Sequence, residues 1–134
     1  MPRFMLDTNM CIYLIKNQPE TVAQRFASCF VGDVVMSAVT YAELEFGVLM
    51  SRRPARERRI LAKLAEDIPV LSFDRKAASA YGAIRLAAKE RRKDQLDKLI
   101  AAHAISLGVT LVTNNESDFS AYPGLTIENW VKQQ

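Results

Sequence analysis

The chain has 134 residues, of which 49% are hydrophobic and 25% are charged, and its formal net charge is +3. This length suffices for one domain with a buried core, and the composition excludes a disordered or fibrous chain. No apolar run approaches the roughly 20 residues of a membrane-spanning helix and the first residues lack a secretion signal, so we expect one cytoplasmic domain over residues 1–134.

Short β-type runs alternate with helical patterns along the chain. The expected strands are Arg3–Leu6, Val34–Ser37, Pro69–Leu71, Val109–Thr113 and Leu125–Ile127. The expected helices cover residues 8–16, 20–30, 41–51, 55–66, 75–91 and 95–107. Several of these strands are almost continuously apolar, which is typical of a parallel sheet covered on both faces. The alternation therefore predicts an α/β fold, a three-layer α/β/α sandwich with a mainly parallel central sheet.

Positive charge is unevenly distributed. One run of arginines comprises Arg52, Arg53, Arg56, Arg58 and Arg59, and a second basic run comprises Arg91, Arg92 and Lys93. Basic runs suit the phosphate backbone of a nucleic acid, but they are also typical of solvated helix surfaces. The charge alone does not identify a partner.

The residues that commonly bind zinc are expected to belong to the core. Cys11 and Cys29 lie inside apolar helical patterns, without the spacing of a zinc motif or a disulfide framework, so we expect two reduced core cysteines. His103 lies within the apolar stripe of the helix over residues 95–107. The members of that stripe are Leu96, Leu99, Ile100, His103 and Leu107. We interpret His103 as a core histidine rather than as a metal ligand or a general base.

Polar residues follow three of the expected strands, where ligands bind in parallel sheets. Asp7, Thr8 and Asn9 follow the first strand, and Glu43 lies beyond the second. The strand Val109–Thr113 leads into the segment Asn114–Asp118. Asp97 lies in the first turn of the preceding helix, which should run antiparallel to that strand and begin at the same edge. We therefore expect acidic side chains to converge at one edge of the sheet.

Each acid also has a structural interpretation. Asp7 suits the N-cap of the helix after it, while Thr40–Glu43 and Asp94–Asp97 both fit the capping box. On a helical wheel Asp97 lies at the edge of the buried stripe, beside small alanines, whereas Asp94 is turned away and Lys98 faces solvent. We interpret Asp94 as the helix cap and Asp97 as a ligand.

Convergence distinguishes a chemical site from a set of independent caps. Three carboxylates in one cleft would repel one another and raise their pKa values unless a cation lay between them. Oxygen ligands without histidine or cysteine favour Mg²⁺ or Mn²⁺ over zinc. Next to a phosphodiester such an ion supports hydrolysis.

Four motifs in this chain together resemble those of PIN-domain proteins, and most closely the VapC toxins of type II toxin–antitoxin systems. They are MLDTN at residues 5–9, SAVTYAEL at 37–44, DKLIAAHA at 97–104 and LVTNNESDF at 111–119. The resemblance extends over essentially the whole chain, including PGLTIENW at 123–130. It implies a PIN-like nuclease domain of the α/β/α class.

The resemblance also assigns roles to individual residues. It implies that Asp7 and Asp97 bind Mg²⁺, for which Mn²⁺ can substitute, and that Glu43 completes the catalytic acids. Thr8 and Asn9 would support the first acid through hydrogen bonds. Many relatives have a fourth acid at the position of Asn115, which is neutral here. Asp118 could compensate for it, and its alternative interpretation is a turn residue before Phe119.

The function implied is that of a Mg²⁺-dependent endoribonuclease that inhibits growth and cuts a structured RNA such as a tRNA. The implied partners are a VapB-like antitoxin, whose tail would lie in a groove beside the acids, and a second copy of the chain. Apolar positions near residues 41–66 suit such a homodimer, although core packing explains them too. Two alternatives remain, a non-catalytic RNA- or protein-binding module of the same fold and a structure-specific DNA nuclease.

Overall fold

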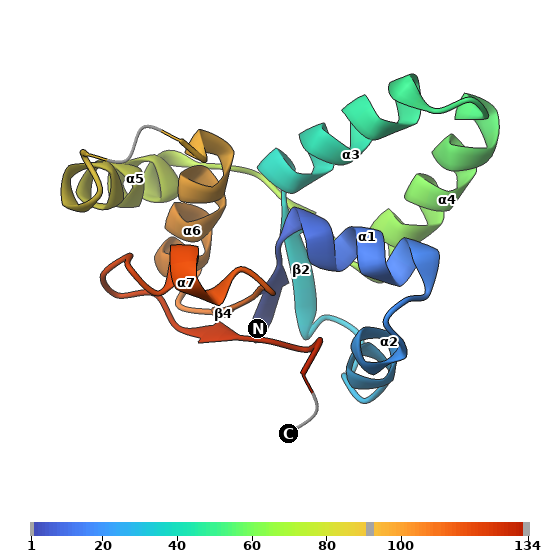
Figure 1. The fold of residues 1–134 in the computed structure, drawn as a ribbon, viewed down its shortest axis with the longest axis horizontal. Helices are drawn as coiled ribbons and strands as arrows, with labels where there is room; N and C mark the ends of the chain where they lie inside the picture. Colours follow the sequence, from blue (N-terminus) through green and yellow to red (C-terminus); the bar gives the residue numbers. More distant parts are fainter. Residues whose placement is uncertain (1, 91–92, 133–134) are drawn as a thin grey trace.

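The computed structural model describes residues 2–90 and 93–132 (Figure 1). Its strands are β1 (Phe4–Leu6), β2 (Val34–Ser37), β3 (Val70–Leu71), β4 (Thr110–Val112) and β5 (Ile127–Glu128). Its longer helices are α1 (Thr8–Lys16), α2 (Glu20–Ala27), α3 (Ala38–Met50), α4 (Pro54–Asp67), α5 (Arg75–Ala87) and α6 (Gln95–Leu107). A short helix, α7 (Glu116–Phe119), was not predicted from the sequence. Arg91 and Arg92 of the second basic run lie outside the described residues.

The five strands form one parallel sheet in the order β3-β2-β1-β4-β5. Helices α1 to α4 lie on one side of this sheet, and α5, α6 and α7 lie on the other (Figure 1). The predicted three-layer α/β/α sandwich with a parallel sheet is therefore confirmed. Because β1 lies between β2 and β4, residues that follow these three strands meet at one edge of the sheet.

Two hydrophobic cores lie between the layers, one on each face of the sheet. Both faces contribute side chains because successive residues of a strand point to opposite faces. Phe4, Leu6 and Met36 belong to the core under α1–α4. Met5 and Val35, which alternate with them, belong to the core under α5 and α6. Both faces of the central strands are buried, which accounts for their nearly continuous apolar sequence.

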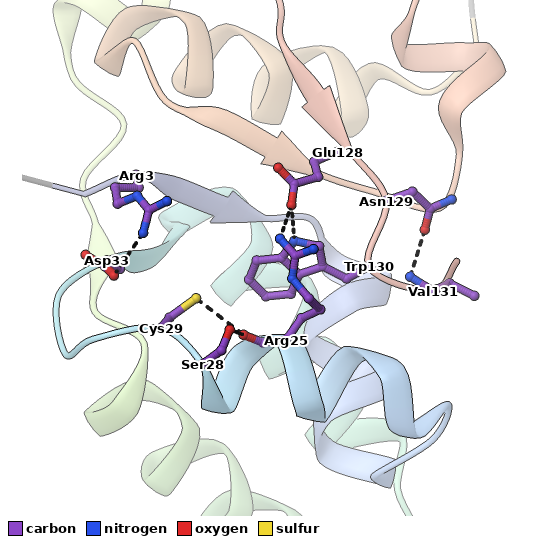
Figure 2. Close-up of polar contacts among 9 residues, drawn as sticks. All are labelled: Arg3, Arg25, Ser28, Cys29, Asp33, Glu128, Asn129, Trp130 and Val131. Atoms are coloured by element: carbon purple, nitrogen blue, oxygen red, sulfur yellow. Dashed lines mark hydrogen bonds and ion pairs between the residues drawn. The ribbon is translucent and has the colours of Figure 1, made fainter. Parts of the chain in front are cut away.

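The C-terminal strand is attached to α2 by a polar cluster at the rim of the first core (Figure 2). Glu128 on β5 accepts hydrogen bonds from the Arg25 guanidinium and, at 2.9 Å, from Nε1 of Trp130. The Arg25 guanidinium lies 5.5 Å from the centre of the Trp130 ring. The ring itself is 1% exposed and meets Phe4 edge to face. One arginine thus connects a helix, an edge strand and a core aromatic residue.

Three predicted helix boundaries are corrected, and one of them is the end of α2, which lies at Ala27 rather than at residue 30. Helix α3 begins at Ala38 rather than near residue 41, because the Ser37 side chain caps it by accepting the N–H of Val39. The predicted capping box over Thr40–Glu43 is therefore wrong, and Glu43 lies in the interior of a helix. Helix α5 ends at Ala87, before the predicted residue 91.

The predicted wheel of α6 is wrong at two positions. Leu96 is 47% exposed, although it was expected in the buried stripe, and Lys98 is 1% exposed, although it was expected to face solvent. The reason is that α6 packs against α5 as well as against β4 and α3, so burial does not follow a single stripe. His103 is buried as predicted.

Both cysteines are free thiols, as predicted, with Cys11 buried and Cys29 partly buried. Burial raises the pKa of the Cys11 thiol, and the nearby charge of Asp7 adds to that effect. None of the described helices is both long and apolar enough to cross a membrane.

Candidate active site

The Asp7 carboxylate is held in place by two hydrogen bonds at the end of β1. Its Oδ1 accepts the Met10 N–H at 2.9 Å and thereby caps α1. The side chain of Thr113, just beyond β4, also forms a hydrogen bond with it. Asp7 is 5% exposed, and this burial raises its pKa despite both hydrogen bonds, with the Glu43 charge raising it further. Asp7 is therefore both a cap and a buried carboxylate whose charge lacks full compensation.

Glu43 reaches the same place from α3. Its Oε1 accepts a 2.6 Å hydrogen bond from the Thr8 hydroxyl, and Thr8 Oγ1 lies 3.4 Å from Oγ1 of the buried Thr40. The structure thus gives Thr8 a different partner from the one expected, since it orients Glu43 rather than Asp7. Thr8, the residue after Asp7, therefore links the end of β1 to Glu43 on the helix that follows β2.

Asp97 completes the acidic group from the first turn of α6. Its pKa is raised to about 6, mainly by burial and then by the charges of Asp94, Asp7, Glu43 and Asp118. Asp94 occupies the N-cap position of α6, as predicted, but with φ of 63° its side chain makes no capping hydrogen bond. The predicted capping role of the Asp94 side chain is therefore wrong, and the carboxylate acts on Asp97 through its charge.

Asn115 and Asp118 form a pair beyond β4. The amide of Asn115 donates a 2.7 Å hydrogen bond to Oδ2 of Asp118, and its backbone N–H donates to Oγ1 of Thr113. Asp118 lies in α7 rather than in a simple turn. Because the charge of Asp118 raises the pKa of Asp97, this carboxylate belongs to the electrostatic environment of the site.

The donor chemistry of the site suits a hard divalent cation. Asp7, Glu43 and Asp97 offer oxygen atoms alone, and the raised pKa values of both aspartates show unfavourable burial of like charges that a cation would relieve. Across residues 2–90 and 93–132, no three carboxylate, imidazole or thiol groups lie close enough together to enclose an ion as they stand. Coordination by all three acids would therefore require their side chains to move closer together.

An apolar groove opens beside the acids, with a volume of about 850 Å³. Thr8, Asn9 and Glu43 form its polar end. Its apolar wall includes Ile12, Ala42, Phe46, Leu96 and Leu99. Leu96 is exposed because it borders this groove. Asn9, which was expected to support Asp7 through a hydrogen bond, lines this groove.

Two residues of the site were not predicted from the sequence. Thr113 was assigned only as the end of a strand, although a hydroxyl residue beside β1 at the carboxyl edge was a usable signal. Thr40 was assigned to a helix cap, and nothing in the sequence indicated that it would be buried next to Thr8.

Comparison with known proteins places this geometry in context. Residues 4–125 match the model of the PIN domain family. The tRNA(fMet)-specific endonuclease VapC of Shigella flexneri is 41% identical over 97% of this chain and 99% of its own. Ribonuclease VapC2 of Haemophilus influenzae (strain Rd) is 35% identical over 98% of this chain and 100% of its own. In the crystal structure of DNA-bound VapBC from Salmonella typhimurium, one chain is similar with a TM-score of 0.89, at 39% identity over 97% of this chain and 99% of that one.

Proposed function

The chain belongs to the PIN-domain family, among its VapC ribonucleases, and from this membership we propose that it is a Mg²⁺-dependent endoribonuclease toxin that cuts a tRNA. The observation that carries the proposal is the convergence of Asp7, Glu43 and Asp97, since the charges of the first two raise the pKa of Asp97. Asp97 from α6 is influenced by Asp7 after β1 and by Glu43 on α3, so three separate elements present negative charge to one place.

In this proposal Asp7 and Asp97 hold the metal ion and Glu43 completes the acidic set. Thr113 and the Met10 N–H orient Asp7, and Thr8 orients Glu43. When bound, Mg²⁺ would polarise the phosphoryl oxygen and lower the pKa of an attacking water molecule. Mn²⁺ would serve as a substitute, because it takes the same oxygen ligands.

Asp118 is proposed to supply the negative charge that Asn115 lacks. It lies near enough to influence Asp97, and the Asn115 amide holds its carboxylate at 2.7 Å. The pair would then act as one unit, with the amide orienting the acid. Asn9, at the polar end of the groove, is proposed to contact the RNA or water molecules bound to the acidic side chains.

The proposed tRNA substrate follows the relatives. Two VapC proteins, from Shigella flexneri and Salmonella typhimurium, are named tRNA(fMet)-specific endonucleases and are 41% and 39% identical to this chain. Initiator tRNA is therefore the first RNA to test. The proposed location of the reaction is the cytoplasm, where tRNA is found.

The proposed protein partner is a VapB-like antitoxin. Solved relatives include VapBC complexes from Rickettsia felis and Salmonella typhimurium. The apolar groove beside Glu43 is a suitable site for an apolar segment of such a partner, because Phe46 and Leu96 are exposed along it. A basic side chain on the same segment would be attracted to the acids.

A homodimer is proposed on the exposed apolar surface of α3. Phe46, Leu49 and Met50 are 65%, 72% and 70% exposed, at a spacing that places them on one side of the helix. A second copy that covered this stripe would remove it from water.

The direct test uses purified protein and initiator tRNA. Cleavage should require Mg²⁺, stop with EDTA and fall by at least a hundredfold in Asp7→Asn. An Asp7→Asn variant that cuts as fast as the parent would overturn the site assignment.

A non-catalytic binding module is the second candidate, since Asn115 replaces an acid. It predicts that RNA binds equally well in EDTA and that no cleavage occurs with any divalent ion. Parallel binding and cleavage assays on the same RNA separate the two functions. Competition with a DNA substrate distinguishes an RNA-specific enzyme from a DNA nuclease of the same fold.

A further inference from the structure

A buried hydrogen bond joins the two helices that carry Glu43 and Asp97. The Nδ1 atom of His103, on α6, lies 2.8 Å from Oγ of Ser37, which is the last residue of β2 and the N-cap of α3. The two residues are 2% and 0% exposed. Ser37 Oγ also accepts the Val39 N–H at 3.1 Å, so the same hydroxyl group caps α3 and contacts α6.

The imidazole ring of His103 is held in a defined orientation. The Phe73 ring meets it edge to face, with the ring centres 5.5 Å apart and the planes at 79°. Burial lowers the pKa of His103, against a smaller opposing effect of the Asp74 charge. The lowered pKa favours the neutral ring, and its Nδ1 atom is engaged with Ser37.

The two acids lie at equal distances along their helices from this hydrogen bond. Glu43 follows Ser37 by six residues on α3, and Asp97 precedes His103 by six residues on α6. At about 1.5 Å per residue, each acid is roughly 9 Å along its helix from the bond. A change of several degrees in the angle between the helices would therefore move either carboxylate by about 1 Å.

The apolar groove separates α3 from α6 over the same span. It is lined from Ala38 to Phe46 on α3 and by Leu96 and Leu99 on α6. Side-chain packing between α3 and α6 is therefore incomplete along this span, while each helix also packs against other elements, α3 against α1 and α4 and α6 against α5. The hydrogen bond lies where the two helices approach each other, next to the start of α3.

We propose that the hydrogen bond between His103 and Ser37 fixes the angle between α3 and α6 and thereby the separation of Glu43 and Asp97. His103 is then a positioning residue for the acidic site. Its importance for metal binding rests on the proposed function, in which these acids hold a divalent ion. A histidine that only filled space would be replaceable by an apolar ring of similar size.

Two substitutions distinguish these roles. His103→Phe keeps a ring that can contact Phe73 but cannot bond to Ser37. His103→Asn is smaller, yet its amide reaches the region of Nδ1 and can restore the hydrogen bond. Val22→Ala shortens a buried side chain of α2, on the other side of the sheet, and serves as the control for a general loss of stability.

The first measurement is the affinity for Mn²⁺ alone, obtained from the electron paramagnetic resonance signal of the free ion. We expect roughly tenfold weaker binding in His103→Phe, which is the lower range for loss of a group that orients metal ligands. His103→Asn should recover most of that loss, and Val22→Ala should bind like the parent. The double variant Ser37→Ala/His103→Phe should bind Mn²⁺ no more weakly than whichever of the two single variants binds it more weakly. Parent-like binding by His103→Phe, or equally weak binding by His103→Phe and His103→Asn, would overturn the proposal.

A second measurement needs no metal ion. Spin labels on Gly47→Cys, an exposed position outside the stripe of Phe46, Leu49 and Met50, and on Leu96→Cys report the distance between α3 and α6. The labels are placed in a Cys29→Ala background, while the buried Cys11 stays unlabelled. His103→Phe should shift or broaden the distance distribution, and His103→Asn should restore it. An unchanged distribution in His103→Phe would overturn the proposal. If the parent neither binds Mn²⁺ nor cuts RNA, the proposed function fails, but this distance still tests the hydrogen bond.

Discussion

The Thr8 hydroxyl donates a 2.6 Å hydrogen bond to Oε1 of Glu43 and so joins the start of α1 to α3 across the acidic site. Glu43 lies on a helix beside an open groove, whereas Asp7 is fixed by its own cap. The orientation of Glu43 therefore depends on Thr8 more than that of Asp7 depends on any single neighbour.

Removal of this hydroxyl should slow cleavage without unfolding the protein. Thr8→Val keeps the shape of the side chain but cannot donate to Glu43, so we expect a single-turnover rate at least tenfold below that of the parent. Thr8→Ser should restore most of the rate. Equal rates for Thr8→Val and Thr8→Ser would show that Glu43 does not depend on this hydrogen bond.

The raised pKa of Asp97, about 6, predicts a pH-dependent loss of stability in the metal-free protein. Between the ordinary pKa of 3.8 and about 6 the folded state binds more protons than the unfolded state, so the free energy of unfolding falls as pH rises through this interval. Asp97→Asn removes this effect. At pH 7.5 its melting temperature in EDTA should exceed that of the parent, and the difference should shrink toward pH 4.

With a divalent ion present, the parent should have a higher melting temperature than Asp97→Asn. Mg²⁺ should raise the melting temperature of the parent and leave Asp97→Asn nearly unchanged, since binding to the folded state stabilises it. A parent that Mg²⁺ does not stabilise at any accessible concentration would contradict the assignment of Asp97 as a ligand.

Substitution at the Asn115–Asp118 pair tests whether Asp118 compensates for the missing acid. Asp118→Asn should weaken Mn²⁺ binding and slow cleavage by about tenfold or more, because it removes one charge near Asp97. Asn115→Asp places a carboxylate oxygen where an amide now donates, 2.7 Å from Oδ2 of Asp118. It should lower the melting temperature in EDTA and raise it above that of Asp118→Asn when Mn²⁺ is added. Full activity of Asp118→Asn would show that Asp118 has only a structural role in α7.

The exposed stripe on α3 predicts the oligomeric state. Size-exclusion chromatography with light scattering should give a dimer for the parent at micromolar concentration. Leu49→Glu should give a monomer, because it places a charge in the middle of the stripe formed with Phe46 and Met50. A monomeric parent would contradict the homodimer.

The sequence was most informative where one physical signal dominated. Continuous apolar strands indicated a sheet buried on both faces, and the ends of β1, β2 and β4 led to the neighbourhood of Asp7, Glu43 and Asp97. Chain direction alone brings these positions to one edge, so their convergence could be predicted without side-chain detail.

Local patterns failed where tertiary contacts decided the outcome. The capping box at Thr40–Glu43 was satisfied in the sequence, but Ser37 begins α3 one turn earlier and Thr8 takes the Glu43 carboxylate. Lys98 is buried because α6 is covered on more than one side. The contact between His103 and Ser37 joins residues 66 apart, and no periodic pattern reports a pair of that kind.

The most direct test of the central claim is the sequencing of RNA 5′ ends after brief expression of the parent and of Asp97→Asn in bacteria. The parent should produce new 5′ ends concentrated at one position of one tRNA, with initiator tRNA examined first, and growth should stop. Asp97→Asn, expressed to the same level, should produce none of these ends. Identical new ends in both strains, or no new ends with folded parent protein present, would contradict the assignment of this chain as a ribonuclease that acts through its acidic site.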